Sequence, residues 1–242
     1  MCTVSFIPVH DKIFITHNRD EKAARLKAIP PKMYTINGHD LLFPRDSEAG
    51  GTWIAMDTMG NAAVLLNGAS EKHVPRPPYL KSRGLAFLDI VATDDAYNGW
   101  QQTGLKGIEP FTLILFSRGN LMECRWNGKE KQDTMLNTTA CHTWSSVTLY
   151  DEITIGKRQA WFQSWLKQHT QPNATAIIQY HLSAGEGDPT TSLKMNRKGE
   201  LLTVSLTCME IFPDKGKMRY HDLQEQLQFE KEIAFTKIAA TP

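Results

Sequence analysis

The sequence predicts an α+β protein built mainly from antiparallel strands. Two observations lead to this fold class: short apolar runs joined by turn residues dominate the first seventy residues and return near the end, and helical spacing appears between them. The resulting order is strands, helix, strands, helices, strands. It differs from the strict strand and helix alternation of a parallel doubly wound sheet.

The first expected element is a β-hairpin at the start of the chain. Residues 3–9 and 13–17 are apolar segments separated by His10-Asp11, which is typical of a tight turn. Because proline cannot donate a backbone hydrogen bond, Pro8 indicates that this end of the first strand lies at an edge or a bulge.

A second hairpin is expected from residues 52–57 and 62–66, with a turn around Gly60. We expect both hairpins to bring their ends to one side of a sheet. Residues 71–82 contain three prolines and are expected to form a loop.

The middle of the chain combines a helix with a third hairpin. Leu85, Leu88 and Val91 have helical spacing, and residues 111–116 and 121–126 form a strand pair around a turn.

Two helices and a last group of strands complete the chain. A long helix begins near Asp151, and Asn173 is a good N-cap for a further helix. Residues 192–195 and 201–211 resume the β pattern. With no internal repeat and no convincing linker, we expect residues 1–242 to form a single domain.

Composition restricts the function. A chain of 242 residues can bury roughly 70–75% of its unfolded surface without metal or disulfide support. The net charge is +1 and no long basic run is present, so nucleic-acid binding is not expected. The four cysteines are far apart and the histidines follow no metal-ligand spacing, so no metal site is expected.

Location is predicted from the same composition. No apolar segment approaches the roughly 20 residues that span a bilayer, so we expect no transmembrane segment. The chain begins with neither a signal-peptide nor a lipoprotein pattern, and the scattered cysteines fit a reducing compartment. A cytoplasmic location is therefore expected.

Cys2 is the residue most suggestive of chemistry. If Met1 is removed, the mature chain begins with a cysteine whose thiol and free α-amino group belong to one residue. The amine can then accept the proton that the nucleophile loses, the task that histidine performs in other acyl-transfer enzymes. Such a site also needs a cation near the thiol and a carboxylate near the amine, which Arg19 and Asp20 can supply.

The same residues have a purely structural interpretation. Free cysteine is among the most buried residue types, so Cys2 can simply open a buried strand. Arg19 and Asp20 can form a surface ion pair. Position alone favours this second interpretation.

Four segments of the chain change that balance by their order and spacing: Met1-Cys2, Asn18-Arg19-Asp20-Glu21, Gly50-Gly51-Thr52-Trp53-Ile54 and Ala63-Val64-Leu65-Leu66-Asn67. Together they resemble the NRDE family, which includes the transport and Golgi organisation 2 proteins. The likeness is close over residues 1–70, and looser matches at 144–146 and 190–199 extend it along most of the chain.

The resemblance implies an Ntn-hydrolase-like fold, a four-layer αββα sandwich with two mainly antiparallel sheets, similar to the penicillin V acylase and bile-salt hydrolase group. It implies catalytic roles for Cys2, Arg19, Asp20 and Asn67, with Asn67 near the oxyanion. No cofactor is implied for catalysis.

The chain departs from the hydrolase pattern in two places. The hydrolases separate their arginine and aspartate by two residues, whereas Arg19 and Asp20 are adjacent. Neighbouring strand residues point to opposite faces, so both reach Cys2 only if the strand ends at Asn18. Gly187-Asp188-Pro189 replaces the family's Gly-Thr-Arg, leaving the second arginine of the hydrolase site without an evident counterpart.

Two functions are compatible with these patterns. The first is an amidohydrolase in which Cys2 attacks an amide or other acyl substrate at a non-peptide C–N bond. The second is a non-catalytic carrier on the same fold, because the resemblance also points to haem trafficking and to acyl-lipid or acyl-thioester metabolism. In the second case the bound ligand is haem or an acyl group. The oligomeric state is not predicted by the sequence.

Overall fold

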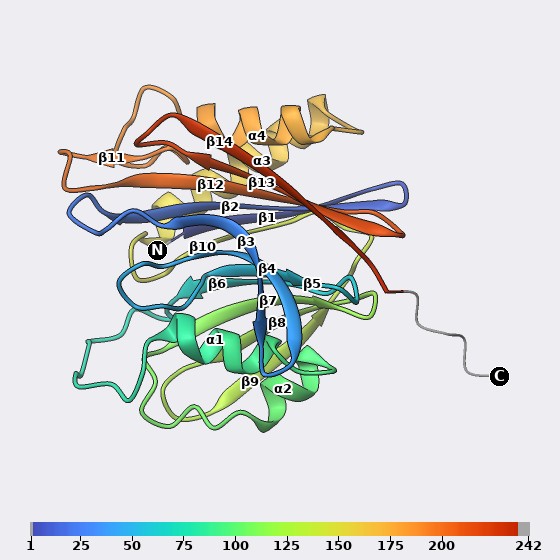
Figure 1. Ribbon diagram of the computed structural model, residues 1–242. Helices are drawn as coiled ribbons and strands as arrows, with labels where there is room; N and C mark the ends of the chain where they lie inside the picture. Colours follow the sequence, from blue (N-terminus) through green and yellow to red (C-terminus); the bar gives the residue numbers. More distant parts are fainter. Residues whose placement is uncertain (1, 237–242) are drawn as a thin grey trace.

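The protein consists of two antiparallel β-sheets packed face to face, with helices on both outer sides. The computed structural model describes residues 2–236. Figure 1 shows the four layers in order: the helices α3 and α4, the first sheet, the second sheet, and the helices α1 and α2. The predicted α+β class and the αββα sandwich are confirmed.

The first sheet holds the chain start and the C-terminal strands. Its order is β10-β1-β2-β12-β13-β14, with β11 paired to β12, and each strand pair is antiparallel. The strands are β1 (Cys2–Val9), β2 (Lys12–Lys22), β10 (His142–Ser145), β11 (Asn196–Arg197), β12 (Leu201–Ile211), β13 (Lys215–Asp222) and β14 (Leu227–Ala234).

The second sheet is a simple meander in chain order from β3 to β9. Its strands are β3 (Ile29–Ile36), β4 (His39–Arg45), β5 (Ile54–Asp57), β6 (Ala62–Asn67), β7 (Phe111–Ser117), β8 (Asn120–Trp126) and β9 (Lys131–Leu136). Between the two sheets lies the larger apolar core, to which both sheets contribute.

The four described helices begin at side-chain caps that the sequence supplies. Ser82, Asp95, Asp151 and Asn173 each accept a hydrogen bond from a backbone N–H of the first turn. The helix start near Asp151 and the cap at Asn173 are confirmed. The helices are α1 (Arg83–Val91), α2 (Ala96–Gln102), α3 (Glu152–Gln168) and α4 (Ala174–Ser183).

The first hairpin fixes the register of the strands that carry the predicted site. Its turn at His10-Asp11 is confirmed, and the pairing of Val9 with Lys12 places Cys2 directly opposite Arg19. Pro8 lies beyond the part of β1 that pairs with β10, so its lack of an N–H donor leaves that pairing intact.

Two expectations about the elements need correction. The two hairpins do not belong to one sheet: β1 and β2 lie in the first sheet, and β5 and β6 in the second. Residues 192–194 form bends and Met195 is irregular, so the strand that pairs with β12 there is only β11. The structure also contains elements for which no pattern was identified, including β3, β4, α2, β13 and β14.

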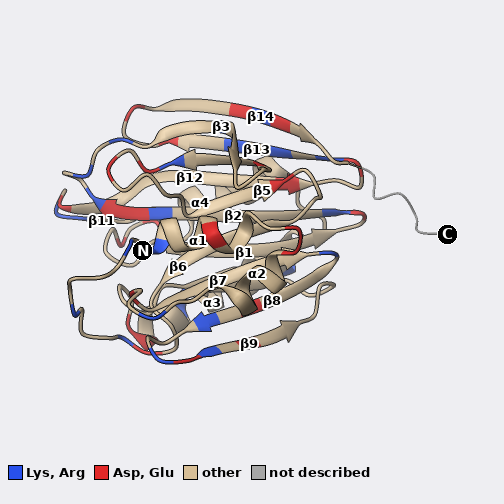
Figure 2. Ribbon diagram, turned by 60° about the horizontal axis from the view of Figure 1, so that its bottom comes forward, with Lys and Arg blue, Asp and Glu red and all other residues tan. Residues whose placement is uncertain are grey.

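Charged residues are dispersed. Figure 2 shows acidic and basic positions interspersed over the outer strands and loops, with few on the central strands. On β13 and β14, for example, Lys217 lies 2.9 Å from Glu230 and 3.0 Å from Glu232. Among residues 2–236, no helix is both long enough and apolar enough to cross a membrane.

Candidate active site

A cleft opens in front of Cys2. It has a volume of about 140 Å³ and lies where the ends of β1, β2 and β6 meet the first turn of α1. Cys2, Arg19 and Asn67 all line it, so the structure brings three of the four predicted site residues together. Although Cys2 lines the cleft, it is only 3% exposed.

Arg19 is held rigidly in this cleft. Its Nη2 donates to Asp46 Oδ2 over 2.7 Å, and its guanidinium carbon lies 4.1 Å from the centre of the Trp53 ring. Asp46 also accepts hydrogen bonds from Arg25 at 3.0 Å on each carboxylate oxygen. Asp46 therefore forms ion pairs with both Arg19 and Arg25, and its negative charge partly offsets the positive charge of Arg19.

Burial and neighbouring charges set the ionisation of these groups. Burial raises the pKa of the Cys2 thiol, and the nearby negative charge of Asp20 adds to this increase. A hydrogen bond from the backbone of Asp20 acts in the opposite direction. Burial also opposes the charged form of Asp46, but hydrogen bonds from Arg25 and the Ala49 N–H outweigh it and lower the pKa of Asp46.

Asp20 lies on the other face of β2. The strand does not end at Asn18 but continues to Lys22, so Arg19 and Asp20 point to opposite faces. Arg19 enters the cleft, and the Asp20 carboxylate faces the helical layer. There it accepts hydrogen bonds of 2.6 Å from the Tyr150 hydroxyl and from Thr203 Oγ1. Burial raises the pKa of Asp20, while the positive charge of Arg158 lowers it.

Asn67 stands at the end of β6 with its side chain unengaged. Its backbone oxygen accepts a 2.7 Å hydrogen bond from Ser146 Oγ, and the Ser146 N–H donates to the Cys2 carbonyl over 2.9 Å. Ser146 thus ties the two sheets together beside the cleft. The side-chain amide of Asn67 donates no hydrogen bond to any described residue, so it is available to a ligand.

Arg83 is a cleft residue that the sequence patterns did not indicate. It is the first residue of α1, and Ser82, Arg83 and Gly84 line the cleft together. Its Nη2 lies 3.2 Å from Glu109, which also contacts His73 at 3.1 Å. No local sequence pattern links Arg83 with Cys2. Arg83 lines the cleft only because α1 packs against the segment before β5.

Asn18, the first residue of the Asn-Arg-Asp-Glu segment, has a structural task. Its amide nitrogen donates to the carbonyls of His181 and Leu193 at 3.0 and 2.9 Å, and its oxygen accepts from His181 Nδ1. His181 Nε2 is then the acceptor for the Ser5 hydroxyl at 2.7 Å. This serine, histidine and asparagine chain is fully buried, so it fastens α4 to the first sheet instead of meeting a substrate.

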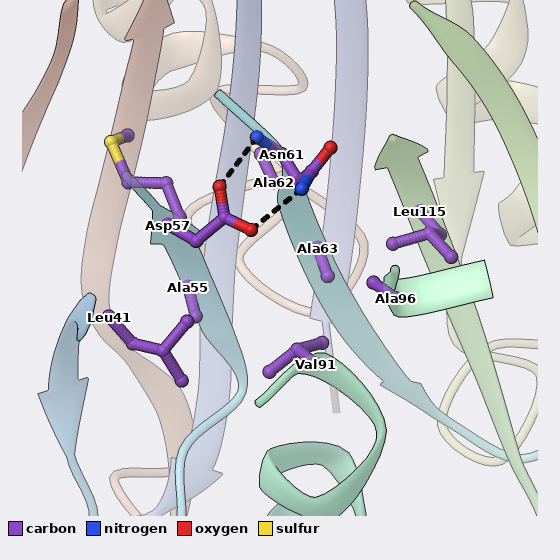
Figure 3. Close-up of a pocket in the computed structure, with 10 residues that line it drawn as sticks. Leu41, Ala55, Asp57, Asn61, Ala62, Ala63, Val91, Ala96 and Leu115 are labelled. Carbon is purple, nitrogen blue, oxygen red and sulfur yellow. Dashed lines mark hydrogen bonds between the residues drawn. The ribbon is translucent and has the colours of Figure 1, made fainter. Parts of the chain in front are cut away.

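Two other cavities of the protein lack the reactive thiol found in the Cys2 cleft. Figure 3 shows the one between α1, α2 and the second sheet, where Asn61 binds both oxygens of the Asp57 carboxylate at 2.7 and 2.9 Å. Its accessible volume is about 10 Å³, enough for a single water molecule. A larger hollow of about 520 Å³ beside the start of α3 contains no thiol. Within the described part of the chain, no group of three metal-ligating side chains is present.

The paired antiparallel sheets between helical layers, with a cysteine opening an interior strand, make up an Ntn-hydrolase-like fold. The chain belongs to the Transport and Golgi organisation 2 family, whose model matches residues 1–213. The resemblance noted in the first seventy residues is therefore confirmed. A comparison with curated protein sequences finds no match.

Solved structures show the same fold at low sequence identity. An N-acylethanolamine-hydrolyzing acid amidase orthologue from Caenorhabditis elegans is 14% identical, with a TM-score of 0.60 over 86% of this chain and 92% of that one. A variant of the conjugated bile acid hydrolase from Clostridium perfringens is 10% identical, with a TM-score of 0.59 over 98% of this chain and 97% of that one. A second variant of that hydrolase is 8% identical, with a TM-score of 0.58 over the same shares.

Proposed function

We propose that this protein is an amidohydrolase in which Cys2 is the nucleophile, acting on a non-peptide C–N bond. The observation that carries the proposal is the arrangement of the Cys2 thiol, the Arg19 guanidinium and the free Asn67 amide around one cleft. A nucleophile, a cation and an oxyanion donor are the groups that acyl transfer requires. The likeness to an amidase and a hydrolase agrees with this chemistry at the level of fold.

The reaction begins with attack of the Cys2 sulfur on the amide carbonyl. The α-amino group of Cys2 takes the thiol proton and returns it to the leaving nitrogen, so the C–N bond breaks as the thioester forms. Water then cleaves the thioester and releases the carboxylic acid. This sequence requires Cys2 to be the first residue of the mature chain.

The surrounding residues have separate tasks in this mechanism. Arg19 provides positive charge beside the sulfur, and Asn67 donates a hydrogen bond to the oxygen that becomes negative in the transition state. The α-amino group belongs to the backbone of Cys2 and does not have to enter the cleft. Asp20, held by Tyr150 and Thr203 on the other face of β2, therefore orients it from that face.

The charged walls of the cleft favour hydrolysis of a polar substrate over carriage of an apolar one. Glu21, Arg25 and Asp46 line the cleft together with Arg19 and Arg83. A haem or acyl carrier needs predominantly apolar walls. We therefore make the amide reaction, and not ligand transport, the proposed function.

The proposal is tested with an acyl p-nitroanilide as a reactive amide probe. The wild-type protein is expected to release nitroaniline and to gain the mass of one acyl group, whereas Cys2→Ala is expected to do neither while keeping its melting temperature. Cys141→Ala is a suitable control, because Cys141 is half-buried and lies outside the cleft. Acylation that persists in Cys2→Ala would exclude Cys2 as the nucleophile.

A further inference from the structure

Arg83 reaches the cleft because α1 is fixed against the segment that precedes β5. A Cβ atom on Gly51 would lie 2.4 Å from the backbone carbon of Gly84, a distance that folded proteins do not tolerate. A Cβ on Gly84 would lie 2.8 Å from the Thr52 oxygen, and the Thr52 N–H donates to the Gly84 oxygen over 3.4 Å. Gly51 and Gly84 allow the backbone of α1 to contact the backbone of the segment before β5. This contact fixes the position of the Arg83 backbone, from which its side chain extends.

The guanidinium of Arg83 is then oriented by its ion pair. Glu109 holds it at 3.2 Å, and Glu109 is in turn held by His73. The Arg83 side chain is 19% exposed, so its charge acts in a largely dehydrated environment. Coulombic interactions are stronger there than in bulk water.

The surroundings of Cys2 do not all favour a thiolate. Arg19 is engaged by Asp46, and burial and the carboxylate of Asp20 both disfavour a thiolate at Cys2. Arg83 lines the same cleft. Burial lowers the pKa of Arg83, while negative charges on Glu109 and Cys2 act in the opposite direction and favour its protonated form. Because such an interaction is mutual, the positive charge of Arg83 must also favour the thiolate.

The N-terminal turn of α1 also favours the thiolate of Cys2. Ser82, Arg83 and Gly84 are the N-cap and the first two residues of this helix, and all three line the cleft. Helix N-termini carry a partial positive charge that lowers the pKa of a nearby thiol.

We propose that Arg83 is the second cationic group of the Cys2 site, and that it favours the thiolate from the wall of the cleft that α1 forms. Arg83 is a positioning residue that acts through the charge on Cys2. The inference deepens the proposed function and rests on Cys2 being the reactive group.

The test measures the rate of iodoacetamide alkylation of Cys2 against pH, read at the Cys2 peptide by mass spectrometry. In Arg83→Gln the midpoint of this profile is expected to rise by about one pH unit, which slows alkylation at pH 7 about tenfold. Arg83→Lys, which keeps the charge, is expected to restore most of the rate. Arg76→Gln is the matched control, because Arg76 is an exposed arginine of the adjoining loop that does not line the cleft.

A second variant guards against a failure of Arg83→Gln to fold. Glu109→Gln removes the carboxylate that offsets the Arg83 charge, so it is expected to move the midpoint in the opposite direction, to lower pH. Thermal unfolding of each variant confirms that folded protein is compared.

The possible failures can be told apart. If Cys2 of the wild type reacts no faster than an ordinary thiol, both the proposed function and this inference are overturned. If wild-type Cys2 is reactive and is acylated by the amide probe, but folded Arg83→Gln has the same pH profile, the inference alone is wrong. A midpoint that fails to move in both Arg83→Gln and Glu109→Gln leads to the same conclusion.

Discussion

Cys2 and Arg19 are direct partners in the antiparallel pairing of β1 and β2. The two-residue turn at His10-Asp11 fixes the register of this hairpin. The register is continuous from the pair Val9 and Lys12 at the turn to the pair Cys2 and Arg19 at the open end. Directly opposed residues point to the same face of a sheet. A turn eight residues away therefore puts Arg19 and Cys2 on one face of the sheet, where both line the cleft.

Replacing the free amide at the cleft tests the oxyanion role of Asn67. In Asn67→Ala, the rate of acylation by the anilide probe is expected to fall by about 10²- to 10³-fold, the usual effect of removing one oxyanion donor. Stability is expected to change little, because Ser146 bonds to the backbone oxygen of Asn67 and not to its side chain. Stopped-time mass spectrometry gives the rate.

The exposed Asn98 of α2 provides the control for that measurement, since Asn98→Ala removes an amide far from the cleft. An Asn67→Ala protein that is acylated as fast as the wild type would eliminate Asn67 as the oxyanion donor.

The contact between Gly51 and α1 predicts a substitution that damages stability and site together. Gly51→Ala puts a methyl group 2.4 Å from the Gly84 backbone carbon, so α1 must shift. Overpacking of this kind typically costs about 1–3 kcal/mol, and each kcal/mol lowers the melting temperature by roughly 2–4 °C in a chain of this size. Alkylation of Cys2 is expected to slow as well, because Arg83 moves with the helix.

Gly156→Ala is the matched control for Gly51→Ala. Gly156 lies within α3, and apart from its chain neighbours and the backbone of its own helix no described atom lies within 4 Å of an added Cβ. Since alanine is the better helix former, this variant is expected to be as stable as the wild type or up to about 1 kcal/mol more stable. Equal melting temperatures for Gly51→Ala and the wild type would refute the close contact.

The buried histidine beneath α4 predicts destabilisation in mild acid. Burial, assisted by the positive charge of Arg158, lowers the pKa of His181 to about 3. The unfolded chain binds this proton near pH 6.5, so between the two values the unfolded state binds more protons and stability falls as pH falls. His181 is expected to contribute about 2 kcal/mol of the stability lost between pH 7 and pH 5.

Urea unfolding at several pH values measures this contribution. His181→Gln removes the titrating group, so its stability should depend less on pH than that of the wild type, although it is lower at pH 7 through loss of the bonds to Ser5 and Asn18. His10→Asn alters an exposed turn histidine and should keep the wild-type dependence. Identical pH dependence in His181→Gln and the wild type would show that His181 is not buried in its neutral form.

Patterns that depend on neighbouring residues were readable from the sequence. The His10-Asp11 turn determines the partnership of Cys2 and Arg19, and the caps at Asp151 and Asn173 determine where α3 and α4 begin. The alternation of side chains along β2 also places Arg19 and Asp20 on opposite faces. The sequence left open only the residue at which this strand ends.

Features that depend on packing between distant segments were not readable. Asp46 engages Arg19 across the two sheets, and Arg83 enters the cleft only because Gly51 and Gly84 meet. Bends at 192–194 replace the strand expected over 192–195. There the Leu193 carbonyl accepts a hydrogen bond from the buried Asn18 amide instead of from a sheet partner. Tertiary hydrogen bonding overrode the local β pattern at that point.

The most direct test of the account is a mass spectrum of the N-terminal peptide, taken from protein expressed in its native host and treated with the anilide probe. The proposed mechanism predicts a peptide that begins at Cys2 and carries one acyl group on that residue. A peptide that retains Met1, or one that begins at Cys2 but stays unmodified while the probe is present in excess, would contradict it.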